Sequence, residues 1–173
     1  MKYLLALMLL SSSLFSFGES IQSFEADFVQ TITDETGKEL IYKGSIHTKR
    51  PSLVLWNYTE PSRAAKKLYV NDTRAVLVQP MLEQVTISPI RDGMSFFDIL
   101  SSAKAVDQTH YRARYKNIDF TLLQENGVII SLSYQDELEN DILIVFSKQR
   151  QNRPIEDKLF IPKVPEDYDI IKN

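Results

Sequence analysis

The chain has no cysteine among its 173 residues, and it has only two histidines and five glycines. Without cysteine it forms no disulfide, so an exported form would depend on its core and its hydrogen bonds. His47 and His110 have no partners at metal-ligand spacing, which nearly excludes a histidine or cysteine metal site. The sequence has no glycine-rich phosphate loop and no Gly-x-Ser-x-Gly nucleophile motif. It therefore favours a protein that is not an enzyme and needs no cofactor or metal.

An excess of positive charge is also missing: Lys and Arg number 20, Asp and Glu number 23, and the net charge is −3. Proteins that bind nucleic acid through charge have a basic balance, so we expect no nucleic-acid partner. Acidic residues group at Asp136, Glu137, Glu139 and Asp141 without the glycine and distal glutamate of a calcium-binding loop. A solvated hairpin turn around Asn140 is the favoured interpretation, and a cation site is the alternative.

The N-terminal segment, residues 1–18, has the features of a secretory signal peptide. Lys2 supplies the positive charge, residues 3–10 form an unbroken apolar run, and Ser16 and Gly18 stand at positions −3 and −1 of a cleavage site. The apolar run is too short to span a bilayer comfortably, so an uncleaved membrane anchor is the less favoured alternative. We predict that residues 1–18 are removed and that residues 19–173 form a single domain with its own core.

Alternation of apolar and polar residues with period two recurs from Phe24 to the end of the chain, which is typical of half-buried β-strands. The predicted strands are residues 24–32, 40–48, 52–59, 66–71, 74–79, 83–88, 111–116, 118–124, 128–135, 141–148 and 155–161. Many short strands joined by short turns favour an antiparallel sheet that curls into a barrel or half-barrel. We therefore expect a mainly β protein of about eleven strands.

One central stretch breaks this pattern. Apolar residues at helical spacing follow Asp92-Gly93, namely Phe96, Phe97, Ile99 and Leu100. Residues 101–110 could continue as a second short helix. A short helix across one concave face of the sheet would act as a lid, and a lidded apolar barrel suits a lipid ligand. The alternative is that these side chains are ordinary core residues of a buried helix.

Several segments, in order, resemble motifs of the outer-membrane lipoprotein carriers, the LolA family. Residues 24–30 (FEADFVQ) resemble an F-x-A-x-F-x-Q opening, and residues 50–61 (RPSLVLWNYTEP) resemble an R-P-x(4)-W-x-Y-x(2)-P segment. Residues 68–72 (LYVND) and 80–85 (PMLEQV) resemble the strand, turn and P-x-x-x-Q-V hairpin that follow, and residues 160–169 resemble the closing segment. The family usually has an N-terminal helix between the cleavage site and the first motif. Here only residues 19–23 lie between them, so either this helix is absent or cleavage occurs earlier than after Gly18.

The resemblance implies an incomplete antiparallel β-barrel with a helical lid. It also implies a periplasmic carrier that binds the acyl chains of lipoproteins, receives them from an inner-membrane ABC transporter and delivers them to an outer-membrane acceptor. The carrier would be a monomer and would catalyse no reaction. A related periplasmic domain that binds other lipids or glycolipids, or that senses lipoproteins, is the alternative.

The resemblance also implies which residues form the site. Strand parity puts Val54, Trp56 and Tyr58 on one face, and the motif match places that face inside the barrel. The predicted lipid-binding residues are Phe24, Phe28, Val54, Trp56, Tyr58, Phe96, Phe97, Ile99 and Leu100. Arg50 matches the arginine that holds the lid closed, since its guanidinium suits the carbonyl groups of a helix end. Alone, Trp56 would be a core residue and Arg50 a surface residue.

Overall fold

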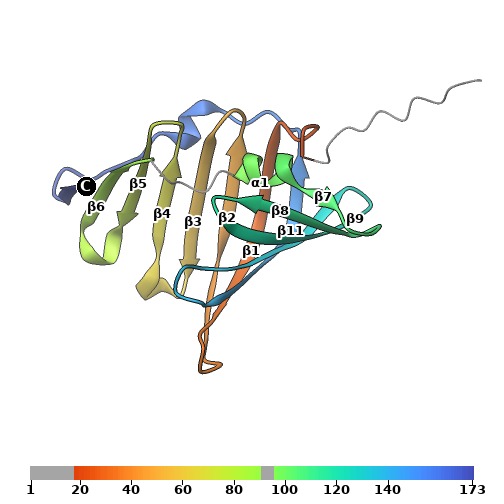
Figure 1. Cartoon of the computed structure of the whole chain (residues 1–173). Helices are drawn as coiled ribbons and strands as arrows, with labels where there is room; N and C mark the ends of the chain where they lie inside the picture. The colour runs from red at the N-terminus through yellow and green to blue at the C-terminus, as the bar shows by residue number, and fades with distance from the viewer. Residues whose placement is uncertain (1–17, 91–95) are drawn as a thin grey trace, which may run out of the picture.

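The computed structural model describes residues 18–90 and 96–173, and these form one twelve-stranded sheet with a short α-helix (Figure 1). The strands are β1 (Ser23–Thr33), β2 (Glu39–Lys49), β3 (Leu53–Glu60), β4 (Lys66–Val70), β5 (Arg74–Gln79), β6 (Gln84–Pro89), β7 (Lys104–Ala105), β8 (His110–Tyr115), β9 (Ile118–Glu125), β10 (Val128–Gln135), β11 (Asp141–Gln151) and β12 (Asp169–Lys172). The helices are α1 (Phe96–Ser102) and the 3₁₀ turns η1 (Ser62–Ala64), η2 (Pro80–Leu82) and η3 (Asp157–Phe160).

The strand order is β12-β6-β5-β4-β3-β2-β1-β11-β10-β9-β8-β7, and the two end strands do not pair with each other. The sheet curls so that β8 and β9 lie over the same face of β1 and β2, with α1 between the two parts (Figure 1). An unclosed, mainly antiparallel barrel with a short helix is therefore confirmed. The exception is β12, which pairs with β6 in parallel.

Short polar turns join the long hairpins. In the turn between β1 and β2 the Asp34 carboxylate accepts the N–H groups of Thr36 and Lys38, and Gly37 has a φ of 80°. In the turn between β10 and β11 the Asp136 carboxylate accepts the N–H groups of Leu138 and Asn140. Asp136 therefore organises a hairpin turn, as the favoured interpretation of the acidic group predicted.

The predicted strand at residues 155–161 is wrong, and β12 was not predicted. Ile155 lies in irregular chain and η3 follows it, with the side chains of Ile155 and Phe160 packed against the outer face of β3–β6. Pro154 and Pro162 flank this segment and have no N–H group for a strand ladder, which favours irregular structure. The apolar side chains of this segment pack onto the face of the sheet, and its backbone does not form a strand of the sheet.

The predicted helix over residues 101–110 is also wrong. Helix α1 ends at Ser102, and β7 begins two residues later. The Asp107 carboxylate accepts the N–H groups of Thr109 and His110 and so forms the turn between β7 and β8. These two N–H groups, together with the His110 ring 3.0 Å away, hold the pKa of Asp107 well below its usual range, which keeps the turn acceptor ionised.

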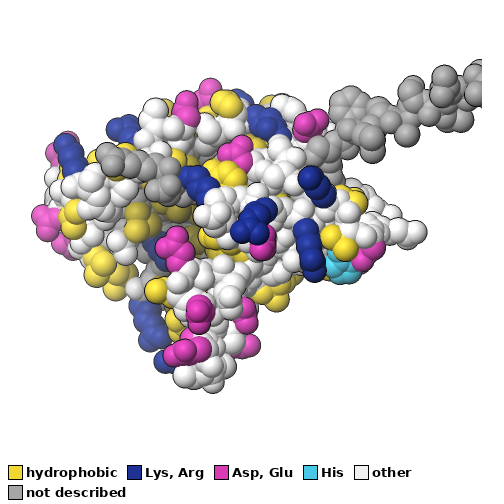
Figure 2. All heavy atoms as spheres, in the orientation of Figure 1, with side chains coloured by type: hydrophobic (Ala, Val, Ile, Leu, Met, Phe, Trp, Pro, Cys, Tyr) yellow, Lys and Arg dark blue, Asp and Glu magenta, His cyan; other side chains and the backbone are white. Residues whose placement is uncertain are grey.

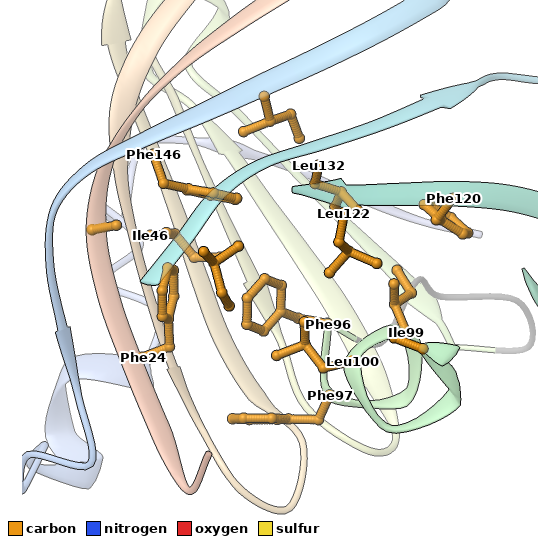
Figure 3. Packing of buried hydrophobic residues seen from close by; sticks show 14 of the residues in the cluster. Phe24, Ile46, Phe96, Phe97, Ile99, Leu100, Phe120, Leu122, Leu132 and Phe146 are labelled. Atoms are coloured by element: carbon orange, nitrogen blue, oxygen red, sulfur yellow. The ribbon is translucent and has the colours of Figure 1, made fainter. Parts of the chain in front are cut away.

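The sheet buries apolar side chains on both faces, in two separate clusters. The inner cluster lies on the concave face beneath α1 and contains Phe24, Phe28, Ile46, Val54, the apolar residues of α1, and residues of β8–β11 such as Phe120 and Leu132 (Figure 3). The outer cluster lies on the opposite face of β3–β6 and contains Leu55, Tyr69, Val76, Val78, Val85, Ile155 and Phe160. In the part of the chain that the structure describes, no helix is both long and apolar enough to cross a membrane.

Candidate functional site

A row of apolar side chains crosses the inner face from β2 to β5. Register places Ile46 opposite Trp56, Trp56 opposite Leu68, and Leu68 opposite Leu77. Ile46 is 0% exposed, whereas Trp56, Leu68 and Leu77 are only half-buried. Hydrophobic side chains are visible on the floor of a recess in front of β3 and β4, left of centre (Figure 2). Along this row, the side chains are therefore less buried from β3 to β5 than at Ile46 in the inner cluster.

The predicted residues on the strands all lie on this inner face. Phe24, Phe28 and Val54 are buried, and Trp56 and Tyr58 pack against the same cluster. The Phe28 ring lies 5.1 Å from the Trp56 ring and 5.1 Å from the Tyr58 ring, edge-on in both cases. The shared face of Val54, Trp56 and Tyr58 agrees with strand parity. Their role in binding lipid stays a prediction.

Helix α1 lies over the buried end of the apolar row. Its four predicted residues, Phe96, Phe97, Ile99 and Leu100, are all buried in the inner cluster. The Phe96 ring lies 5.2 Å from the Phe24 ring, so the helix packs directly against β1 (Figure 3). A helix of seven residues is too short to be stable alone, so these contacts hold it in place.

Arg50 connects three parts of the chain at the end of the inner face. Its Nε donates to the carbonyl oxygen of Ile21 at 2.9 Å, and its Nη2 donates to that of Gly18 at 2.8 Å. Nη2 also lies 3.1 Å from the Ser101 hydroxyl, and the guanidinium lies 4.6 Å from the centre of the Phe97 ring. The structure corrects one detail: Arg50 contacts α1 through a hydroxyl and a ring, and its carbonyl acceptors belong to the N-terminal segment.

The N-terminal segment packs closely on α1 at this point. A Cβ atom on Gly18 would lie 2.2 Å from the carbonyl carbon of Leu100, so only glycine permits this approach. The described residues before β1 form a turn and a bend, without a helix. Among the described residues, the helix that covers the inner face is therefore α1.

A polar group borders the apolar row at the other end of β3. The Lys66 ammonium lies 4.8 Å from the centre of the Tyr58 ring and 5.3 Å from that of Tyr42. Burial lowers the pKa of Lys66, and burial is also the main cause of the raised pKa of Tyr58. Tyr42, Lys66, Leu68 and Leu77 were absent from the predicted site. The alternation within the predicted strands places them on the face of Trp56 and could have identified them.

The sequence matches a family model and several proteins of one name. Residues 19–123 match the model of the outer membrane lipoprotein carrier protein LolA. An outer-membrane lipoprotein carrier protein of Helicobacter pylori (strain HPAG1) is 35% identical over 152 residues, which are 88% of this chain and 80% of the relative. The protein of that name from Helicobacter hepaticus is 31% identical over 172 residues, which are 99% of this chain and 95% of the relative.

Solved structures share the fold at low sequence identity. An uncharacterized conserved protein from Thermus thermophilus superposes with a TM-score of 0.53 and 12% identity, over 92% of this chain and 94% of its own. A LolA superfamily protein from Nitrosomonas europaea superposes with a TM-score of 0.50 and 12% identity, over 86% of this chain and 96% of its own. Together with the sequence match over most of its length, these findings show that the chain belongs to the LolA family of outer-membrane lipoprotein carrier proteins.

Proposed function

We propose that this protein carries lipoproteins through the periplasm by binding their acyl chains on the inner face of its sheet. The observation that supports this most directly is the row Trp56, Leu68 and Leu77, which stays half-buried beside a fully buried cluster. A buried methylene contributes roughly 0.8 kcal/mol, so an acyl chain along this row would bind without any specific polar contact. The lipid-binding residues are those predicted from the sequence, together with Leu68 and Leu77.

The helix α1 acts as a lid in this proposal. Its four apolar side chains cover the buried end of the inner face, and an acyl chain that displaced the helix could replace them there. Opening costs free energy, which weakens the net affinity for cargo and so permits its release. Arg50 adds to that cost because its contacts with Ser101 and Phe97 hold the helix closed.

The proposed partners are those that the family resemblance implies. An inner-membrane ABC transporter would load the carrier, and an outer-membrane acceptor would take the lipoprotein from it. The predicted signal peptide, residues 1–18, would export the chain, and the rest would work as a periplasmic monomer. The protein would catalyse no reaction, because its part is to shield acyl chains from water during transfer.

The experiment is lipoprotein release from spheroplasts that contain radiolabelled lipoproteins. Addition of the purified mature protein should move labelled lipoprotein into the soluble fraction, in a complex with the added protein. The control is the Leu68→Glu variant, which puts a carboxylate into the middle of the apolar row. The proposal is wrong if the wild-type protein releases no more lipoprotein than the variant does.

A further inference from the structure

Lys66 is a lysine on the inner, apolar face of the sheet. It pairs with Tyr58 across β3 and β4, and so points to the same side as Trp56 and Leu68. Its ammonium lies near the Tyr58 and Tyr42 rings, whose planes are nearly perpendicular at 88° with centres 6.0 Å apart. The rings therefore form two sides of a corner around the positive charge.

The charge of Lys66 has no counter-ion in the part of the chain that the structure describes. Some lysines are paired there, as Lys43 lies 2.8 Å from a Glu60 oxygen and Lys49 lies 2.6 Å from an Asp157 oxygen, whereas Lys66 is partly buried without such a pair. Among the described residues the Lys66 ammonium interacts with the faces of the two rings. Cation–π contact offsets part of the cost of desolvating an ammonium, and an anion would offset more.

Gln30 adds a second polar group without a partner. It is 8% exposed, lies opposite Tyr42 across β1 and β2, and shares its face with Phe28. Among the described residues none forms a hydrogen bond with its side-chain amide. No buried side-chain nitrogen or oxygen atom of the described residues lacks a partner, so the Gln30 amide reaches solvent. Its NH₂ group is therefore a donor that an incoming acceptor could use.

We propose that Lys66 and Gln30 form a head-group site for an anionic amphiphile whose alkyl chain lies along the row of Trp56, Leu68 and Leu77. The ligand class is a carboxylate or phosphate on an acyl chain, as in a free fatty acid or an anionic lysophospholipid. This inference rests on the proposed function, because the alkyl chain uses the same apolar face. The inference adds a second kind of ligand, whose charged head group is recognised. The lipoprotein cargo is bound through its acyl chains alone.

The test uses the fluorescence of Trp56, the single tryptophan of the chain, which lies between Ile46 and Leu68 on the row. The mature protein is titrated with laurate, with 1-lauroyl-lysophosphatidylglycerol and with uncharged 1-lauroylglycerol. The variants are Lys66→Met and, as the matched control, Lys67→Met, which removes an exposed lysine on the other face of the same strand. Urea unfolding of each variant checks that the fold is intact.

Lys66→Met should weaken laurate binding by about tenfold or more and change lauroylglycerol binding by less than about threefold. The control variant Lys67→Met should bind both ligands as tightly as the wild-type protein does. If Lys66→Met weakens lysophospholipid binding as much as laurate binding, the site also accepts phosphate head groups. If it weakens only laurate binding, the site is specific for carboxylates. The inference alone is overturned if both laurate and lauroylglycerol bind and Lys66→Met weakens them equally, or if only lauroylglycerol binds. If no ligand changes the Trp56 signal, the proposed function fails as well.

Discussion

The two faces of strands β3–β6 are covered in different ways. On the outer face Leu55, Tyr69 and Val85 are buried under a chain segment that continues through η3 to β12. On the inner face the corresponding row stays half-buried beyond the reach of α1. Over these strands the sheet thus has a closed apolar face and a partly open one, and the proposed ligand binding belongs to the second.

The covers also differ in how they are held. The outer cover is the segment from Ile155 through η3 to β12. Lys49 holds it by donating to the carbonyl oxygen of Ile155 at 3.1 Å and to Asp157 at 2.6 Å. The inner cover is a seven-residue helix next to residues 91–95, which lie outside the described part, and Arg50 contacts it at its C-terminal end. A short element held by few polar contacts is the one more easily displaced.

The largest effect is expected from removing the main apolar group of the outer cover. Phe160→Ala should lower the free energy of unfolding by about 3–5 kcal/mol, because it leaves a cavity over the outer cluster. Leu159→Ala is the control, since Leu159 is 38% exposed in the same turn and should cost about 1 kcal/mol or less. Urea denaturation measures both. The folded Phe160→Ala protein should still bind laurate, and a loss of binding would contradict the separation of the two faces.

The open face is tested by a charge placed on it. Leu68→Glu should weaken capture of lipidated cargo by at least about tenfold, because a carboxylate on the apolar row must be desolvated when an acyl chain binds. Lys67→Glu is the matched control, one residue away on the opposite face. Pull-down of lipidated against unlipidated lipoprotein measures the effect. Equal capture by both variants would show that acyl chains bind elsewhere.

The hold on the inner cover is tested at Arg50. Arg50→Leu should bind lipoprotein about tenfold more tightly and transfer it more slowly, because loss of the Ser101 and Phe97 contacts makes the open state less costly. Affinity and transfer rate are measured on the same variant, with Arg50→Lys as the conservative comparison. Slow transfer with unchanged affinity would instead indicate that Arg50 contacts the acceptor, and no change in either would exclude a role for Arg50 in the lid.

The smallest effect is expected at the end of the outer cover. All four residues of β12 are exposed, so deletion of residues 169–173 should lower the free energy of unfolding by only about 1 kcal/mol. The outer cluster should remain covered, because Ile155, Phe160 and Tyr168 precede the deletion. Hydrogen exchange of the β5 amides provides the check. Fast exchange there would mean that β12, rather than the preceding segment, holds the outer cover in place.

Much of this fold could be predicted because it follows local rules. Alternation predicted the long hairpins, and parity placed Trp56 and Tyr58 on the correct face. Residues 155–161 have apolar side chains at spacings that fit a strand, yet only long-range packing decides whether such a segment joins the sheet or crosses it. Alternation could have placed Lys66 on the inner face, but not its contact with the Tyr42 ring. That contact depends on the curl of the sheet and on a residue distant in sequence.

The contact between Arg50 and Gly18 has a consequence for the order of events during export. Gly18 is the last residue of the predicted signal peptide, and its carbonyl oxygen accepts one of the Arg50 hydrogen bonds. Cleavage after Gly18 would remove that acceptor and uncover the backbone of Leu100, while the Ile21 and Ser101 contacts remain. A precursor with its leader attached would therefore keep Arg50 and α1 more firmly fixed than the processed protein. In the proposed lid mechanism, removal of the predicted leader would therefore make α1 easier to displace.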